Sequence, residues 1–347
     1  MATFVDTYQV RAKSNAGLYD ATSGQGLGDL IEQIQRSAGY NPVYQVNDCD
    51  DADQLANNGW SESDSGTFDV DDTSADNRIA TNALLLTGTA ATDGTQYAEC
   101  TYIDGSARPS KDATGIDWRD SNYIGWWMSA EGASEYDTAG ELQFAIVNNT
   151  GGTNVVQTKH DVPAAVNAVH RMVEIDISDD DRDRVTSIRF YSNNSATGQA
   201  VEIDAMIRYK FGNGKGPAIG NIAILPIASG QTLSRGDICQ LNVVGTTGPN
   251  VQIEGGADIN TLGVVVTGGT GVANGSVYAA VQTSGFAYLE ANAGTVAGEV
   301  GIWQSASLIE GGATGEDEDG FCKIWEAAGG QYDHILCSIG TSQTFIS

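Results

Sequence analysis

The chain has 347 residues, enough for two domains of ordinary size, and its hydrophobic content of 41% is compatible with packed β-structure rather than disorder. Its 45 acidic and 17 basic residues give a net charge of −28, which disfavours nucleic acid and anionic membranes as partners. No run approaches the ~18 apolar residues of a membrane span and no secretory leader opens the sequence, so we expect a soluble, cytoplasmically made protein.

Lysine is rare in this acidic sequence. Lysine occurs only at positions 13, 111, 159, 210, 215 and 323. A carboxylate-rich surface with few lysines is typical of proteins adapted to high salt, where screening weakens the repulsion between like charges. We therefore hypothesise a halophilic setting.

The five cysteines are Cys49, Cys100, Cys239, Cys322 and Cys337. They show no CxxC spacing and no Cys/His cluster, and an odd number cannot all pair within one chain. Two precede the glycine-rich segment 211–217 and three follow it, so at most one bridge in each half is possible without crossing. Buried reduced thiols are the simpler interpretation.

Residues 1–40 are predicted to form an N-terminal arm with one short helix. Four apolar residues recur at helical spacing, namely Leu27, Leu30, Ile31 and Ile34. The glycines at 24, 26 and 28 raise the alternative of a dinucleotide cradle. However, no apolar strand precedes them, and Asp29 stands where the third glycine of GxGxxG belongs. We therefore predict an anchoring helix that packs on a neighbouring element.

Residues 41–211 alternate apolar and polar positions in strand after strand, with Gly, Asn, Ser and Asp turns between them. The predicted strands are 82–86, 97–102, 123–128, 141–147, 170–177, 185–191 and 201–209. This number of strands predicts a β-sandwich. The acidic run 179–184 between two of them is interpreted as a solvated turn.

Residues 212–217, which follow Phe211, break the pattern with three glycines and Pro217, so a strand is not expected to continue through them. The Gly-Lys pair suggests a phosphate loop, but Gly216 follows Lys215 where that loop needs Ser or Thr. We predict a linker, hinge-like, between two domains at 41–211 and 218–347.

Residues 218–347 are predicted to form shorter strands, rich in Val, Ile and Ala, with glycine turns between them. The predicted strands are 222–227, 237–242, 262–266, 277–281, 286–289, 300–303, 322–325 and 334–337. Arg235-Gly-Asp237 spells a cell-adhesion tripeptide, but we interpret it as the tight turn that starts a strand. The sequence thus predicts an all-β protein, with a jelly-roll sandwich followed by a small β-barrel-like domain.

Residues 45–211 resemble the galactose-binding-like jelly rolls that occur as carbohydrate-binding modules. The likeness rests on Asp50 and Trp60 before a strand, on Ile-Gly-Trp-Trp at 124–127, and on the closing strands at 173–177, 185–190 and 201–207. This resemblance implies a structural cation near where the first and last strands meet, with Asp48 or Asp50 and Asp204 as the matching positions. Such hard oxygen ligands suit Ca²⁺.

Trp126 and Trp127 are adjacent in a predicted strand, so their rings should point to opposite faces of the sheet. One ring is expected in the core, and the other could form a flat platform for a sugar. The alternative places the outward ring beneath a loop or at a subunit contact.

Residues 218–347 resemble the small β-domains of tailed-phage head decoration proteins. The likeness rests on residues 230–238, 262–266 and 284–289 and on the glycine-rich loop 311–320 before a final strand pair. It implies a homo-oligomeric accessory protein, with a trimer as the first guess, that binds the major capsid protein on the outer surface of the head.

Catalysis is not expected. The chain has three histidines and neither HExxH nor GxSxG, and among 45 acidic residues a carboxylate pair is uninformative. The leading hypothesis is therefore a non-enzymatic virion protein that decorates the head of a tailed virus and displays the jelly roll to host glycans. The alternative is a carbohydrate-binding protein of a tail or cell surface, and a polysaccharide-degrading enzyme is the third interpretation.

Overall fold

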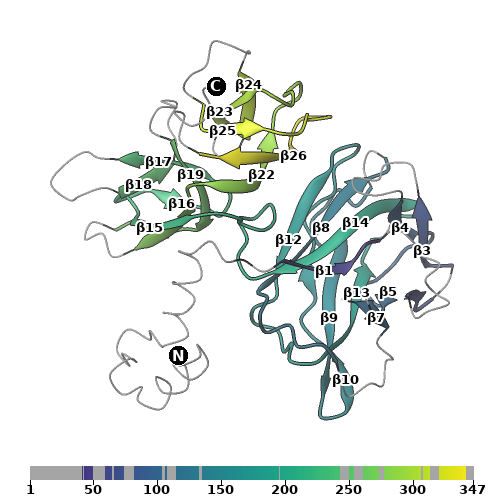
Figure 1. The fold of residues 1–347 in the computed structure, drawn as a ribbon. Helices are drawn as coiled ribbons and strands as arrows, with labels where there is room; N and C mark the ends of the chain where they lie inside the picture. Colours follow the sequence, from purple (N-terminus) through teal and green to yellow (C-terminus); the bar gives the residue numbers. More distant parts are fainter. Residues whose placement is uncertain are drawn as a thin grey trace, which may run out of the picture.

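The computed structural model describes residues 41–340 apart from 42, 50–58, 65, 74–81, 104–105, 108–114, 133–134, 195, 243–249, 254–260, 273–276, 306–307 and 313–319. Its regular elements are all β-strands, so the predicted all-β class is confirmed (Figure 1). The helix predicted in the N-terminal arm lies outside the described residues. Within the described ranges there is no helix of the length and apolar character needed to cross a membrane.

The first half of the chain forms a sandwich of two sheets. One sheet contains β1 (Val43–Asn47), β3 (Phe68–Thr73), β4 (Ala83–Gly88), β8 (Tyr123–Ala130), β12 (Arg171–Asp176) and β14 (Gln199–Tyr209). The other contains β2 (Trp60–Glu62), β5 (Tyr97–Cys100), β9 (Leu142–Thr150), β10 (Thr153–Val156), β11 (His160–Asp161) and β13 (Val185–Ser192). The strand orders are β12-β8-β14-β4-β3 with β1 beside β14, and β10-β9-β13-β5-β2 with β11 beside β9. We call them the junction sheet and the outer sheet.

Aromatic rings fill the space between the two sheets. Trp126 of β8 lies 5.2 Å from Phe144 of β9 and 5.1 Å from Phe190 of β13, measured between ring centroids. Trp60 of β2 stacks on Phe190 at 6.0 Å. These side chains are fully buried, because alternate residues of each strand point to the shared interior.

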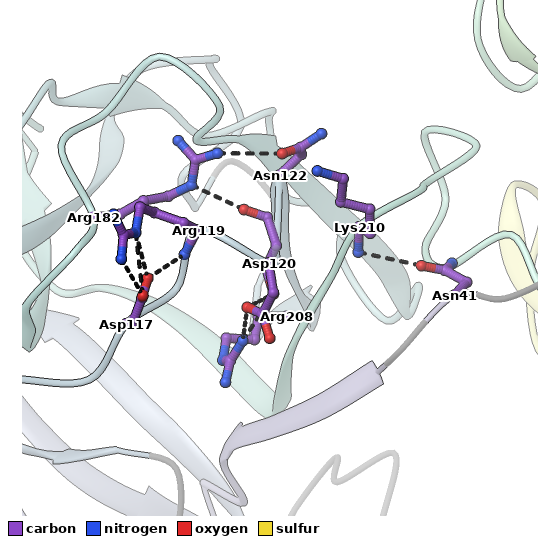
Figure 2. Close-up of polar contacts among 9 residues, drawn as sticks. Asn41, Asp117, Arg119, Asp120, Asn122, Arg182, Arg208 and Lys210 are labelled. Atoms are coloured by element: carbon purple, nitrogen blue, oxygen red, sulfur yellow. Dashed lines mark hydrogen bonds and ion pairs between the residues drawn. The ribbon is translucent and has the colours of Figure 1, made fainter. Parts of the chain in front are cut away.

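A loop at one end of the sandwich is fastened by Arg182, which lies in the acidic turn 179–184. Its guanidinium donates to the Asn122 side chain (Figure 2). It also donates to the carbonyls of Ser121, Ile177, Ser178 and Asp180. Burial lowers the pKa of Arg182, although the surrounding aspartates oppose this shift. The turn is thus only partly solvated at this residue: Arg182 is half-buried and bonds the backbone, while the charges of the neighbouring aspartates still favour its charged form.

Residues 211–217 form a closed loop rather than an extended linker. Asn213 N–H donates to Gly216 O at 3.0 Å, Ala218 N–H donates to Phe211 O at 3.0 Å, and Gly212 pairs with Pro217 in an isolated bridge. Asn41 fastens this loop to the start of β1. Its amide donates to Phe211 O and Ala218 O, and its oxygen accepts from Phe211 N–H. The same oxygen accepts from Lys210 N–H (Figure 2).

The second half contains an open sheet followed by a closed barrel. The open sheet has the order β15-β21-β19-β17-β18, with β15 (Ile222–Pro226), β17 (Ile238–Asn242), β18 (Asn250–Ile253), β19 (Thr261–Thr267) and β21 (Tyr278–Gln282). The barrel closes in the order β22-β24-β23-β25-β26, with β22 (Gly285–Ala291), β23 (Val300–Ser305), β24 (Leu308–Gly312), β25 (Cys322–Ile324) and β26 (Asp333–Ile339). Short pairs are β6 (Tyr102–Ile103) with β7 (Ser106–Ala107) and β16 (Thr232–Leu233) with β20 (Gly269–Thr270).

No sheet in the described part combines strands from both sides of residues 212–217. The predicted boundaries at 1–40, 41–211, 212–217 and 218–347 stay a prediction. The turn predicted at Arg235-Gly-Asp237 is present, with Asp237 N–H donating to Ser234 O at 3.1 Å. All five cysteines are buried, and none of them forms a disulfide.

Candidate functional site

The two tryptophans singled out from the sequence lie inside the molecule. Trp126 is 0% exposed in the sandwich core, and Trp127 is 3% exposed on the opposite face of the junction sheet. The Trp127 ring meets Tyr288 of β22 edge-on, with 4.8 Å between the centroids. Neither ring presents the open face that a sugar platform needs, so that prediction is corrected. The alternation predicted for the two rings is present, but the outward ring is covered by the second half of the chain.

The three aspartates predicted to hold a cation are only partly described. Asp204 is 3% exposed in β14, Asp48 is exposed, and Asp50 lies outside the described residues. The backbone brings the first two together, because Ala205 N–H donates to Asp48 O at 3.3 Å. Among the described side chains, no group of three or more His, Cys, Asp or Glu is placed to hold a metal ion.

The outward face of the outer sheet carries a polar row across three strands. Ser61 of β2 stands opposite Glu99 of β5, and Glu99 stands opposite Arg189 of β13. Arg189 donates to both carboxylate oxygens of Glu99, with Nε to Oε1 at 3.1 Å and Nη2 to Oε2 at 3.3 Å. Their side chains are 18% and 16% exposed, so this two-point ion pair is fixed but reachable from solvent.

A second row runs beside the first and contains two tyrosines. Tyr97 of β5 stands opposite Tyr191 of β13, Tyr191 opposite Gln143 of β9, and Gln143 opposite Asp161 of β11. The two rings are tilted, with centroids 5.3 Å apart. Gln143 Nε2 donates to Asp161 Oδ1 at 2.8 Å. The two rows together are called the aromatic-polar face below.

Cations cover both tyrosine rings of this face. The Arg189 guanidinium lies 4.1 Å from the Tyr97 centroid, and Lys159 Nζ lies 3.8 Å from the Tyr191 centroid. Burial raises the pKa of the Tyr191 phenol, so that hydroxyl stays protonated at neutral pH. Burial opposes ionisation of Arg189, but its hydrogen bonds with Tyr191 and Glu99 outweigh it and raise the pKa. The face therefore keeps fixed charges and fixed hydrogen-bonding roles.

A second concave site lies where the two halves meet. A cavity of about 220 Å³ is lined by ionisable side chains from both halves, among them Arg171, Glu174, Lys215, Arg235, Glu290 and His334. Arg171 Nη2 bonds Glu290 Oε1 at 2.8 Å, and Arg235 Nη1 bonds Glu174 Oε1 at 2.5 Å. Three carboxylates, with Asp237 as the third, balance the three permanently basic side chains.

The buried groups of this cavity join the two halves. Glu174 of β12 also accepts from the Tyr209 hydroxyl at 2.8 Å and from Gly214 N–H at 3.0 Å. Burial raises the pKa of Glu174 despite the opposing Arg235 charge, and burial lowers that of Lys215. The charged side chains bond one another across the cavity. We therefore interpret the cavity as a polar contact that holds the two halves together rather than as a ligand site.

Sequence reasoning missed the aromatic-polar face, although a signal was present. Tyr97 and Glu99 alternate with the core residues Ala98 and Cys100 in β5, and Arg189 and Tyr191 alternate with core residues in β13. The outward positions of a half-buried strand are identified by this period of two. The alternation within each strand does not show that β5 and β13 are neighbours in the same sheet.

No protein-family model and no curated protein sequence matches this chain. Similar solved structures cover about half of it. A family 11 carbohydrate-binding module from Clostridium thermocellum is 16% identical over 48% of this chain and 94% of its own, with a TM-score of 0.33. The CBM22-1 xylan-binding domain from Paenibacillus barcinonensis is 15% identical over 51% and 95%, with a TM-score of 0.31. A family 30 carbohydrate-binding module is 14% identical over 51% and 93%, with a TM-score of 0.36. TM-scores of this size carry no functional conclusion.

Proposed function

We propose that this protein binds a carbohydrate on the aromatic-polar face, without catalytic turnover. The observation that carries the proposal is the pair of adjacent rows in which Tyr97 and Tyr191 lie beside Glu99, Arg189 and Gln143. Sugar rings offer apolar C–H faces to aromatic side chains and hydroxyls to paired donors and acceptors. The rows supply both kinds of partner on three hydrogen-bonded strands, so little ordering is needed on binding.

The charge of the face favours a neutral glycan. Its cations Arg189 and Lys159 are matched by Glu99 and Asp161, whereas the whole chain carries a net charge of −28. An acidic polysaccharide would meet long-range repulsion without a local surplus of positive charge to offset it. A neutral β-linked or mixed glucan or xylan is the ligand class to screen first.

Lys159 covers one ring of this proposed site. It is exposed, and besides its contact with the Tyr191 ring its ammonium donates to Gly94 O at 2.7 Å. Tyr191 is 4% exposed beneath this cation, so a sugar reaches its ring face only by displacing the Lys159 side chain, a contact of about 0.5–1 kcal/mol.

Binding of the full chain to a panel of neutral and acidic glycans tests this proposal. For a neutral ligand found in that screen, Tyr97→Ala should weaken binding about tenfold, because an aromatic contact contributes about 1 kcal/mol or more beyond buried area. Gln143→Ala should also weaken it. Thr153→Ala, on the same sheet but at an exposed end of β10, is the matched control and should not change affinity. The proposal would be refuted if Tyr97→Ala and Gln143→Ala both kept the wild-type affinity, or if the chain bound no neutral glycan.

The head-decoration role stays a second proposal, favoured by two exposed aromatic side chains on the barrel. Trp325 is 56% exposed and Tyr332 is 46% exposed. The Trp325 ring is held in place by Nε1 donating to Ser338 Oγ at 2.9 Å, which suits a fixed protein contact. The partner would be a major capsid protein, with this chain as a homotrimer on the virion surface. Cryo-EM of particles that carry the chain should place it on the head; a position at the tail tip would refute this role.

The structural cation also stays a proposal. Asp48 and Asp204 are the described ligand candidates, and Ca²⁺ is the ion that carboxylate oxygens favour. Metal analysis after purification with and without chelator measures whether an ion is retained.

A further inference from the structure

An apolar strip crosses the outward face of the open sheet in the second half. In the register of β15 and β21, Ile224 faces Ala280, and Pro226 faces Tyr278. Ile222, two residues before Ile224, lies on the same face of β15 and contacts Ala218, Val266 and Ala280 in a small cluster. Ile219 and Phe286 extend the strip at one end, where they form an isolated bridge. We call Ile219, Ile222, Ile224, Tyr278 and Phe286 the apolar strip.

Four members of the strip are strongly exposed. Their exposed fractions are 43% for Ile219, 47% for Ile224, 55% for Tyr278 and 47% for Phe286. Single exposed apolar side chains are ordinary, but four of them on and next to one edge strand, around the buried Ile222, are an apolar patch that favours a contact. Strand β15 is also the edge of its sheet, where an apolar face invites association.

The N-terminal arm leaves the described structure at this strip. Asn41 donates from its side-chain amide to Ala218 O at 3.0 Å, and Ala218 is both the neighbour of Ile219 and a member of the Ile222 cluster. Three further hydrogen bonds hold Asn41 in place. The chain that precedes Asn41 therefore starts beside one end of the strip, whatever path it takes.

The arm carries an apolar stripe of matching length. In the helix that the sequence predicts there, Leu27, Leu30, Ile31 and Ile34 would share one side, and eight helical residues span about 12 Å. The six residues between Ile34 and Asn41 reach up to about 20 Å when extended. Strand β15 has five residues and spans about 17 Å. The stripe can therefore lie along the strip without strain in the connection.

Charge favours the arm over a second copy of the chain as the occupant. Residues 1–40 contain four acidic and three basic residues, so they are almost neutral, whereas the whole chain carries −28. Two whole chains must bring like charges together to share the strip, and the arm does not. Its covalent tether also gives it a local concentration in the millimolar range.

We propose that residues 27–34 of the N-terminal arm, which lie outside the described residues, dock through their apolar stripe on the apolar strip of the same chain. The strip is then the surface through which the N-terminal arm contacts the C-terminal half of the same chain. This docking involves no residue of the aromatic-polar face and does not depend on carbohydrate binding.

Hydrogen exchange of the full chain, followed by mass spectrometry, tests the docking. The variant Leu30→Asp/Ile31→Asp places two charges in the stripe, and peptides covering 219–226 should then exchange at least tenfold faster. The matched control, Gln25→Asp/Gln33→Asp, adds the same charge outside the stripe and should leave those peptides unchanged. Peptides from the barrel strands β25 and β26 report that the fold is intact.

The reciprocal variant Ile224→Asp should speed exchange in peptides covering 27–34. Exchange at 219–226 that is equal in wild type and in the stripe variant would overturn the proposal. Protection that appears only at high protein concentration, together with a dimer mass in light scattering, would also overturn it, since the strip would then be occupied by a second copy.

Discussion

His334 shows how burial at the junction governs a single side chain. Its Nδ1 accepts from Met172 N–H at 2.8 Å, which ties β26 to β12 across the two halves, and its Nε2 lies 3.7 Å from Glu290 Oε1. Burial, reinforced by the Lys215 and Arg171 charges, lowers the pKa of His334 to about 4, although Glu290 opposes the shift. The imidazole is therefore neutral at pH 7.

The depressed pKa of His334 predicts a loss of stability in mild acid. The unfolded chain takes up this proton near pH 6.5 and the folded chain only near pH 4, so His334 leaves stability untouched above pH 6.5 and lowers it as the pH falls towards 4. The full effect is about 3 kcal/mol. Urea unfolding of wild type and His334→Asn at pH 7, 6 and 5 measures it, since Asn keeps an acceptor near the Nδ1 position.

Comparing wild type with His334→Asn separates the contribution of His334 to the pH dependence of stability from that of other groups that titrate in this range. The pKa of His160 is raised by its hydrogen bond with Asp180, so His160 acts with the opposite sign, and it is present in both proteins. The difference in unfolding free energy between wild type and variant should shift in favour of the variant as the pH falls. A difference that stays constant from pH 7 to pH 5 would contradict the prediction.

At the scale of elements, the loop 211–217 is held in place by hydrogen bonds and close packing. Asn41 bonds the backbone at both ends of it, at Lys210 and Phe211 before the loop turns and at Ala218 after it. Glu174 accepts from Gly214 N–H, and Lys215 Nζ donates to Gly236 O at 3.2 Å. Gly212 leaves no room for a larger residue, because an added Cβ would lie 1.8 Å from Glu174 Oε2. The glycines that predicted a flexible hinge are used here for close packing against β12.

Asn41→Ala tests the role of this fastening. The variant removes four hydrogen bonds and leaves backbone groups of Lys210, Phe211 and Ala218 without them, so we expect a loss of about 2–3 kcal/mol in unfolding free energy. Urea unfolding measures the loss, with Thr153→Ala as an exposed control. A change below about 0.5 kcal/mol, the range of neutral surface variants, would show that the loop is held by other contacts.

The longer strands could be predicted from their alternation, and the short or acidic ones could not. Strands β8, β9, β13 and β14 fall on predicted runs, because their core positions repeat every second residue. Strand β3 was missed because its sequence FDVDDT carries three aspartates, which are rare in strands, yet it pairs along its length with β4. Strand β24, with two glycines, was missed although it closes the barrel beside β22 and β23.

For the whole molecule, the net charge of −28 makes repulsion between like charges the dominant long-range electrostatic interaction. Few of the acidic side chains find a cation, since the chain has 17 basic residues for 45 acidic ones, and several of the basic side chains are used inside the junction. Unscreened repulsion favours expansion of the chain, and the Debye length falls from about 30 Å at 0.01 M salt to about 3 Å at 1 M.

We therefore expect the thermal unfolding midpoint to rise steeply between 0.01 M and 1 M salt, and the folded circular-dichroism signal to weaken in dilute buffer. NaCl and KCl should act equally, because screening depends on ionic strength and not on the identity of the monovalent ion. Full structure with an unchanged midpoint in dilute buffer would refute the halophilic hypothesis. A response to one cation only would indicate site binding instead.

The sequence by itself determined the all-β class, most long strands, the acidic surface and the absence of a strand through 212–217, because these depend on composition and on local periodicity. Only the tertiary structure decided what each outward face meets. Alternation placed Trp127 outward, but the covering of its ring by Tyr288 and the meeting of Glu99 with Arg189 depend on strand order. Strand order follows from packing between residues far apart in the chain, and local patterns do not encode it.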